Sequence, residues 1–178
     1  MEPPIKPNIL YLHCHDAGRY VQPYGHAIQT PHIQKLAEQG VLFRQAFSAA
    51  PTCSPSRAAL VTGQWAHCNG MLGLTHRGFA LHDYTQHIVH PLRRAGYTTA
   101  ISGFQHVAPS ATRECIGYDE FLTEDEDFET ITGAAEQFIG RSHKKPFFLS
   151  VGYVAPHRRE EDFHTLFEPE DDRYLRPP

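Results

Sequence analysis

The most informative stretch for the architecture is Asn8-Ile9-Leu10-Tyr11-Leu12, an apolar run that follows prolines. A continuous run of this kind is typical of a strand that is buried in a parallel or mixed sheet. A similar run, Pro146–Tyr153, lies far along the chain. Shorter apolar segments predict two more strands, over Val41–Phe47 and Tyr97–Ser102.

Helices are predicted between these strands from the signals at their ends. The pairs Thr30-Pro31 and Ser54-Pro55 each combine an N-cap residue with a proline at the first helical position. Gly40 and Gly63 mark the two C-terminal ends. Two further helices are expected over about Thr85–Ala95, where Pro91 should kink or delay the helix, and over Glu129–Ile139. The alternation of strands and helices predicts an α/β layered fold, with Glu120–Glu129 as a solvated acidic loop.

Composition and charge exclude several classes of protein. The 178 residues include 16 Lys and Arg against 20 Asp and Glu, a formal net charge of −4, so a basic nucleic-acid surface is excluded. No apolar run approaches the ~20 residues that a membrane helix needs, so no membrane partner is expected. Met1–Pro7 lacks the basic and apolar regions of a secretion signal, which predicts a cytoplasmic protein with reduced cysteines.

Polar side chains cluster where the predicted strands end. His15-Asp16 follows the first strand, and Cys53 follows the second by a short loop. His106 and His157 follow the last two strands. Because ligands of open α/β sheets gather beyond the carboxyl ends of the strands, we expect a site at this edge.

The most specific motif is Cys53-Ser54-Pro55-Ser56-Arg57, which Thr62-Gly63 follows. Cys53 lies at a predicted helix start, where backbone N–H groups and the helix dipole favour anions. Arg57 lies one turn further, and its planar guanidinium group can bind two oxygens at once. The loop of a thiol phosphatase needs a longer spacing and consecutive backbone amides, and Pro55 removes one amide, so that class is excluded.

This motif resembles the C-x-P-x-R signature of the type I, formylglycine-dependent sulfatases. The resemblance implies that a formylglycine-generating enzyme oxidises Cys53 to an aldehyde. The hydrated aldehyde is a geminal diol, and one of its hydroxyl groups attacks the sulfur atom. Such covalent catalysis divides one difficult displacement into two steps.

The stretch Asn8–Gly18 resembles the N-terminal strand of that family, which usually ends in two aspartates that bind calcium. Asp16 matches the second aspartate, and His15 stands where the first would be. Calcium prefers oxygen ligands, whereas imidazole suits softer ions. The resemblance therefore implies a divalent cation, calcium or another metal, at Asp16 and the converted Cys53. His15 either joins these ligands or has a structural role at the strand end.

Two later segments match the family as well. Gly103-Phe104-Gln105-His106 resembles its G-K-x-H segment, which implies that His106 contacts the sulfate or the nucleophile and that Phe104 replaces a lysine. Lys145–Arg158 resembles its P-F-F-L…P-H segment. His157 then matches a histidine that protonates the leaving group, a task that suits imidazole near neutral pH.

The resemblance extends from about Asn8 to Arg158 and implies an alkaline-phosphatase-like sandwich. Because chains of that family are much longer, we expect residues 1–178 to be the N-terminal part of a catalytic domain whose C-terminal part is absent. Thr62–Leu74 looks most like the heparan N-sulfatase (sulfamidase) branch, so the expected substrate is a sulfated small molecule or sugar. Two alternatives stay open: a phosphonate or phosphate ester hydrolase on the same scaffold, and an inactive truncated remnant.

Overall fold

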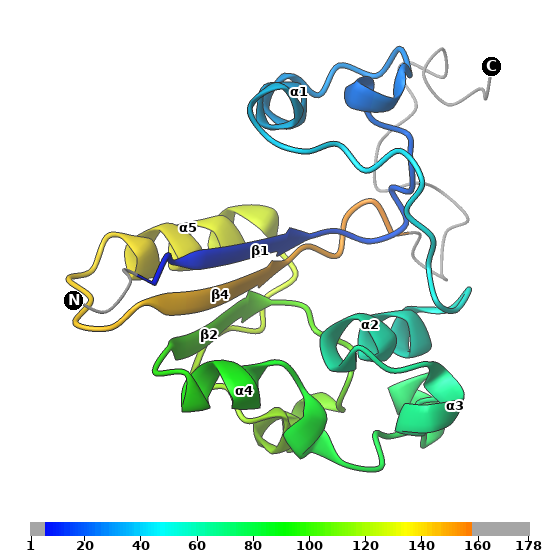
Figure 1. Cartoon of the computed structure of the whole chain (residues 1–178), viewed down its shortest axis with the longest axis vertical. Coiled ribbons are helices and arrows are strands. Elements are labelled where there is room, and N and C mark those ends of the chain that lie inside the picture. Colours follow the sequence, from blue (N-terminus) through cyan, green and yellow to red (C-terminus); the bar gives the residue numbers. More distant parts are fainter. Residues whose placement is uncertain (1–5, 158–178) are drawn as a thin grey trace. The chain divides into compact units, whose positions relative to one another are not determined.

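The computed structural model describes residues 6–157, so Arg158 lies outside the described residues. These residues divide into two compact units. Of the described residues, the first unit contains 6–13 and Ser48–Tyr153, and the second contains Cys14–Phe47 and 154–157. All the strands and the helices α2 to α5 belong to the first unit, and α1 belongs to the second (Figure 1).

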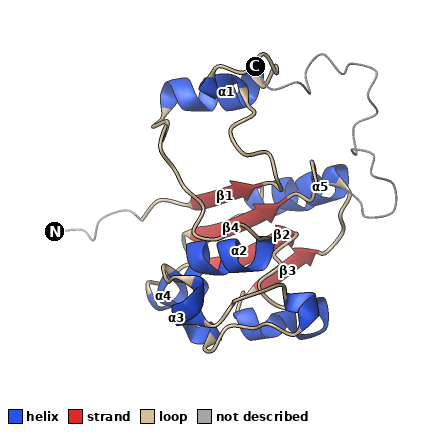
Figure 2. Cartoon of the chain, turned by 90° about the vertical axis from the view of Figure 1, so that its right-hand side faces the viewer, coloured by secondary structure: helices blue, strands red, loops and turns tan. Residues whose placement is uncertain are grey.

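The first unit is built on a parallel sheet of four strands in the order β1-β4-β2-β3 (Figure 2). The strands are β1 (Ile9–His13), β2 (Thr98–Gly103), β3 (Glu120–Thr123) and β4 (Phe147–Gly152). The predicted α/β class is therefore confirmed, and the apolar run of Pro146–Tyr153 forms the buried strand β4. β1 pairs with β4 so that His13 lies opposite Gly152.

Helices of the first unit cover both faces of this sheet, whereas α1 and η1 belong to the second unit. The α-helices are α1 (Pro31–Gln39), α2 (Cys53–Thr62), α3 (Ala66–Asn69), α4 (Val89–Arg94) and α5 (Phe128–Ile139). The 3-10 helices are η1 (Gln22–Tyr24), η2 (Thr75–Arg77), η3 (Tyr84–Gln86) and η4 (Ser110–Ile116). α5 packs Ile131 and Phe138 on the sheet face that carries Leu149. α2 lies on the opposite face of the sheet (Figure 2). Its residue Ala58 and Phe148 of β4 belong to a second core.

The predicted strand over Val41–Phe47 is wrong. This segment is a loop, and its apolar side chains Val41, Phe43 and Phe47 are exposed. Its apolar residues suit a strand, but a strand also needs a neighbour for its backbone N–H and C=O groups. The carbonyl of Phe43 instead accepts a hydrogen bond from the Tyr24 hydroxyl at 2.8 Å. Cys53 consequently follows a loop and not a strand.

The acidic loop predicted over Glu120–Glu129 is also wrong in part. Glu120–Thr123 pairs with β2 and forms the outer strand β3. Arg141 binds Glu120 at 2.7 Å, which offsets a charge on this strand. Asp127 then caps α5, because its side chain accepts a hydrogen bond from the backbone N–H of Thr130 at 2.8 Å.

Most predicted helix ends lie within two residues of the observed ones. α1 spans Pro31–Gln39 as expected, whereas α2 begins at Cys53, one residue before the predicted cap Ser54. The helix predicted over Thr85–Ala95 is shortened, since α4 begins only at Val89 and the preceding turn is η3. No helix in the described part of the chain is long and apolar enough to cross a bilayer.

Candidate active site around Cys53

Cys53 is the first residue of α2, and Thr52 is its N-cap. The first helical hydrogen bond runs from the Ser56 N–H to the Thr52 carbonyl at 3.0 Å. The N–H groups of Cys53 and Ser54 therefore have no acceptor within the helix itself. Pro55 breaks no helical bond at this position. The geometry gives the partly buried Cys53 the electrostatic environment of a helix start, which favours anions.

The start of α2 is anchored by its serines. Ser54 is fully buried, and its hydroxyl oxygen accepts a hydrogen bond from the Thr75 N–H at 3.2 Å. The hydroxyl of Ser56 lies 2.7 Å from that of Ser48. Both serines flank Pro55, so the first turn that carries Cys53 is held by contacts to two other segments.

Arg57 lies one turn after Cys53, on the same side of α2. Its Nη1 atom is 2.8 Å from Nδ1 of His13, the last residue of β1. Its guanidinium carbon also lies 5.0 Å from the centre of the Phe104 ring, in the range of a cation–π contact. The side chain is therefore held at one nitrogen and over one aromatic ring.

His106 follows β2 in a tight loop. Its φ is 59°, a left-handed conformation that is uncommon for a residue other than glycine. The Gln105 side chain supports this loop, because its oxygen accepts from the Val107 N–H at 2.6 Å. The His106 ring lies 5.1 Å from the Phe104 ring and stacks on His76 at 5.7 Å. Phe104 thus contacts both Arg57 and His106 within the first unit.

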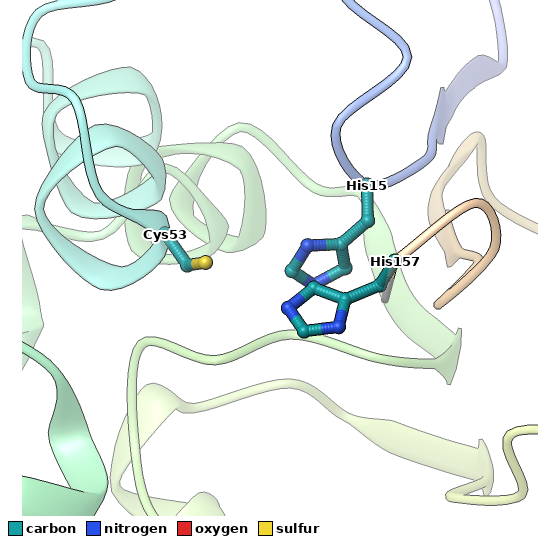
Figure 3. Close-up of side chains that lie close together, drawn as sticks. All are labelled: His15, Cys53 and His157. Carbon is teal, nitrogen blue, oxygen red and sulfur yellow. The ribbon is translucent and has the colours of Figure 1, made fainter. Parts of the chain in front are cut away.

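The second unit contains the other predicted site residues. His15 is buried and its Nδ1 lies 3.9 Å from Oδ1 of the exposed Asp16. The rings of His15 and His157 lie edge to face with their centres 4.6 Å apart (Figure 3). The His15 N–H donates to the Ala155 carbonyl at 3.3 Å, which joins the segments after β1 and β4. Figure 3 also labels Cys53 at the start of α2, in the first unit.

The ligand types in the second unit do not make a complete calcium site. Asp16 and Glu38 are the carboxylates in its described part, and Glu38 binds Gln34 within α1. Calcium takes about 6–8 oxygen ligands, and imidazole suits softer metals. Asp16 with two nearby imidazoles therefore falls short of that set.

Sequence comparison assigns the family. The sulfatase family profile matches residues 7–175. The chain belongs to the sulfatase family. The N-sulphoglucosamine sulphohydrolase of Homo sapiens is 35% identical to this sulfatase-family chain over 162 residues, which are 85% of this chain and 32% of the relative. The N-acetylgalactosamine-6-sulfatase of Rattus norvegicus is 36% identical over 138 residues, 67% of this chain and 25% of the relative.

Solved structures confirm the alkaline-phosphatase-like fold. One protein, solved in complex with its substrate D-glucosamine-2-N,6-O-disulfate, has a TM-score of 0.73 at 26% identity, over 86% of this chain and 35% of that one. The phosphonate monoester hydrolase of Agrobacterium radiobacter shares the fold, with a TM-score of 0.67 at 20% identity over 86% and 42% of the two chains. This sulfatase-family chain thus spans about a third of the length of the relatives it matches first. Sulfatases of this family generally use a metal ion and formylglycine.

Two residues near the sulfatase motif were not singled out from the sequence. His13 is two residues after Tyr11 and four after Ile9, so all three side chains lie on the same face of β1. That is the sheet face that packs against α2. That signal shows its face but not its contact with Arg57. His76, which stacks on His106, lies in η2 and carries no sequence signal that distinguishes it from other histidines.

Proposed function

We propose that residues 1–178 form the N-terminal part of a sulfatase catalytic domain that removes sulfate from an ester or sulfamate. The observation that carries the proposal is the position of Cys53. It is the first residue of a ten-residue helix, with Arg57 one turn on, inside a sequence that matches the sulfatase family. We propose that a formylglycine-generating enzyme converts Cys53 to formylglycine.

Formylglycine supplies a hydrated aldehyde that acts as the nucleophile toward sulfur. In this proposal Arg57 binds oxygen atoms of the sulfate group, because its N–H groups match an oxyanion in geometry and charge. His106 contacts the sulfate or the nucleophile. His157 gives a proton to the oxygen or nitrogen atom of the leaving group, which would otherwise depart as a strong base.

A divalent cation belongs to the proposal as a partner of Asp16, the converted Cys53 and His15. Calcium is the cation that the family resemblance favours. Since the described residues near Asp16 are poor in oxygen ligands, further ligands are required from outside the described residues, or His15 shifts the preference toward a softer metal.

A sulfated sugar is the substrate class that we propose. It is supported by the name of the human relative, an N-sulphoglucosamine sulphohydrolase. The structural relative solved with D-glucosamine-2-N,6-O-disulfate supports the same class. Both relatives are about three times as long as the matched region, so the proposal concerns the whole protein.

Intact mass spectrometry tests the conversion of Cys53. The chain is co-expressed with a formylglycine-generating enzyme, and conversion of the thiol to the aldehyde lowers the mass by about 18 Da. Cys53→Ala should show no such fall in mass on co-expression. Cys68→Ala, which removes another thiol, should keep it. An unmodified Cys53 after co-expression would instead support an inactive remnant.

A phosphonate or phosphate ester hydrolase is the second candidate. The observation in its favour is Phe104, which contacts Arg57 where the family resemblance leads us to expect a lysine. One fewer positive charge weakens the case for a site adapted to sulfate. Parallel assays of the whole protein with sulfate, phosphonate and phosphate monoesters separate the two candidates.

A further inference from the structure

We propose that His13 is a positioning residue that fixes the orientation of the Arg57 guanidinium group for oxyanion binding. The identity of the oxyanion as sulfate rests on the proposed function, but the positioning itself does not. Nη1 of Arg57 lies 2.8 Å from Nδ1 of His13. These residues are 44 positions apart and belong to α2 and β1.

This contact assigns the tautomer of His13. A guanidinium group has only N–H donors, so Nδ1 of His13 is the acceptor. The ring proton then lies on Nε2, which is 3.3 Å from the hydroxyl oxygen of Ser150. Ser150 is a buried residue of β4 and can accept this hydrogen bond. The sheet therefore orients His13 through one ring nitrogen while the other nitrogen holds Arg57.

The sheet also fixes the plane of the His13 ring. The ring stacks on Tyr11 with centres 4.7 Å apart and an angle of 26° between the planes. Gly152, opposite His13 in the sheet register, leaves room for it. A Cβ atom at Gly152 would lie 2.5 Å from Cε1 of the His13 ring. The stacking on Tyr11, the hydrogen bond to Ser150 and the absence of a side chain at Gly152 thus all favour the same position of the His13 ring.

Phe104 restrains the same guanidinium group at its face, with 5.0 Å between the guanidinium carbon and the ring centre. A side chain that is already ordered loses less conformational entropy when it binds a ligand. Immobilising one flexible side chain costs about 0.5–1.5 kcal/mol, which corresponds to roughly a 2- to 10-fold change in affinity. We expect the loss of His13 to weaken oxyanion binding by that factor.

The experiment compares two variants of the chain in which Cys53 is converted. His13→Gln keeps an oxygen that can accept from Arg57, and His13→Phe keeps a ring that can stack on Tyr11 but has no acceptor. Nitrogen NMR reports the tautomer of His13 and the rotation of the Arg57 guanidinium group. Titration with inorganic sulfate, followed by the Arg57 signals, gives the dissociation constant.

In wild type we expect the ring proton of His13 on Nε2 and slow rotation of the Arg57 guanidinium group. His13→Gln should keep this slow rotation. In His13→Phe the rotation becomes fast and the dissociation constant for sulfate rises roughly 2- to 10-fold. Ser150→Ala is a second variant, in which His13 itself is intact, and we expect a smaller effect in the same direction.

Two results would overturn the positioning role: a wild-type His13 protonated at Nδ1, or a folded His13→Phe protein with unchanged Arg57 rotation. The tautomer is measured on wild type, so this arm does not depend on the folding of any variant. If His13 and Arg57 behave as expected while the whole protein, without substitutions, binds no sulfate, the positioning stands and the proposed function fails. The two proposals are therefore tested separately.

Discussion

Gly152 is the residue for which the structure makes the sharpest steric prediction. In Gly152→Ala the new methyl group meets the backbone carbonyl oxygen of Phe104 first, and then the His13 ring, with 2.5 Å between Cβ and Cε1. Overpacking of this kind costs about 1–3 kcal/mol of unfolding free energy. Urea denaturation followed by circular dichroism measures this change.

Gly133→Ala is the matched control. Gly133 lies inside α5, and a Cβ atom there has no neighbour within 4 Å. Alanine in a helix interior is favoured over glycine by roughly 0.5–1 kcal/mol, so this variant should be slightly more stable than wild type. Equal unfolding midpoints for Gly152→Ala and wild type would contradict the close packing of Gly152 against the Phe104 carbonyl and the His13 ring.

At the residue scale, sequence reasoning reaches only what neighbours along the chain reveal. The spacing of Cys53 and Arg57 is local, so their shared helix could be predicted. The partner of Arg57 could not, because His13 is brought to it by the parallel pairing of β1 with β4 and the packing of α2 on that face. Strand periodicity predicts the face of a side chain but not the residue that meets it.

His87, between η3 and α4, gives a prediction at the scale of the element. It is buried, and its Nδ1 accepts a hydrogen bond from the Val89 N–H at 3.2 Å, at the start of α4. Burial lowers the pKa of His87 from 6.5 to about 4, with a smaller contribution from His90. The pKa of His87 is lower in the folded protein than in the unfolded chain. The contribution of neutral His87 to the free energy of unfolding is therefore complete above pH 6.5 and is lost as the pH falls from 6.5 toward 4.

The lowered pKa of His87 corresponds to a loss of roughly 3 kcal/mol of unfolding free energy as the pH falls from 6.5 to 4. Urea unfolding at a series of pH values measures it. His87→Gln removes the titrating group and should flatten this part of the profile, although it lowers stability at neutral pH. An equally steep profile in the variant would assign the pH dependence to other groups.

The elements that could be predicted are those with signals inside their own sequence. α1 begins at Pro31 and ends before Gly40 because both end signals are local. The segments Val41–Phe47 and Glu120–Thr123 were predicted wrongly because a strand depends on a distant partner. The apolar segment has no pairing partner in the described sheet, and the acidic segment pairs with β2. Apolar character misassigned the first segment, and acidic character misassigned the second.

At the scale of the whole molecule, we predict that the 178-residue polypeptide binds calcium weakly and hydrolyses aryl sulfates slowly or not at all, even after Cys53 is converted. It spans about a third of the length of its relatives. In the described part of the second unit, Asp16 is the one carboxylate at the end of β1, against the about 6–8 oxygens that calcium takes. Calorimetric titration with calcium measures the first property, and turnover of a chromogenic aryl sulfate with calcium measures the second.

Cys53→Ala supplies the background rate for this assay, because it cannot form the aldehyde and keeps Arg57 and Asp16. Turnover by the converted chain well above that background would contradict the prediction. It would mean that residues 1–178 already hold every group that the reaction needs, and that Asp16 and the two imidazoles beside it bind a metal other than calcium or need none. A rate equal to the background, together with the loss of about 18 Da that marks conversion, would place the missing groups outside this chain and leave the role of Cys53 intact.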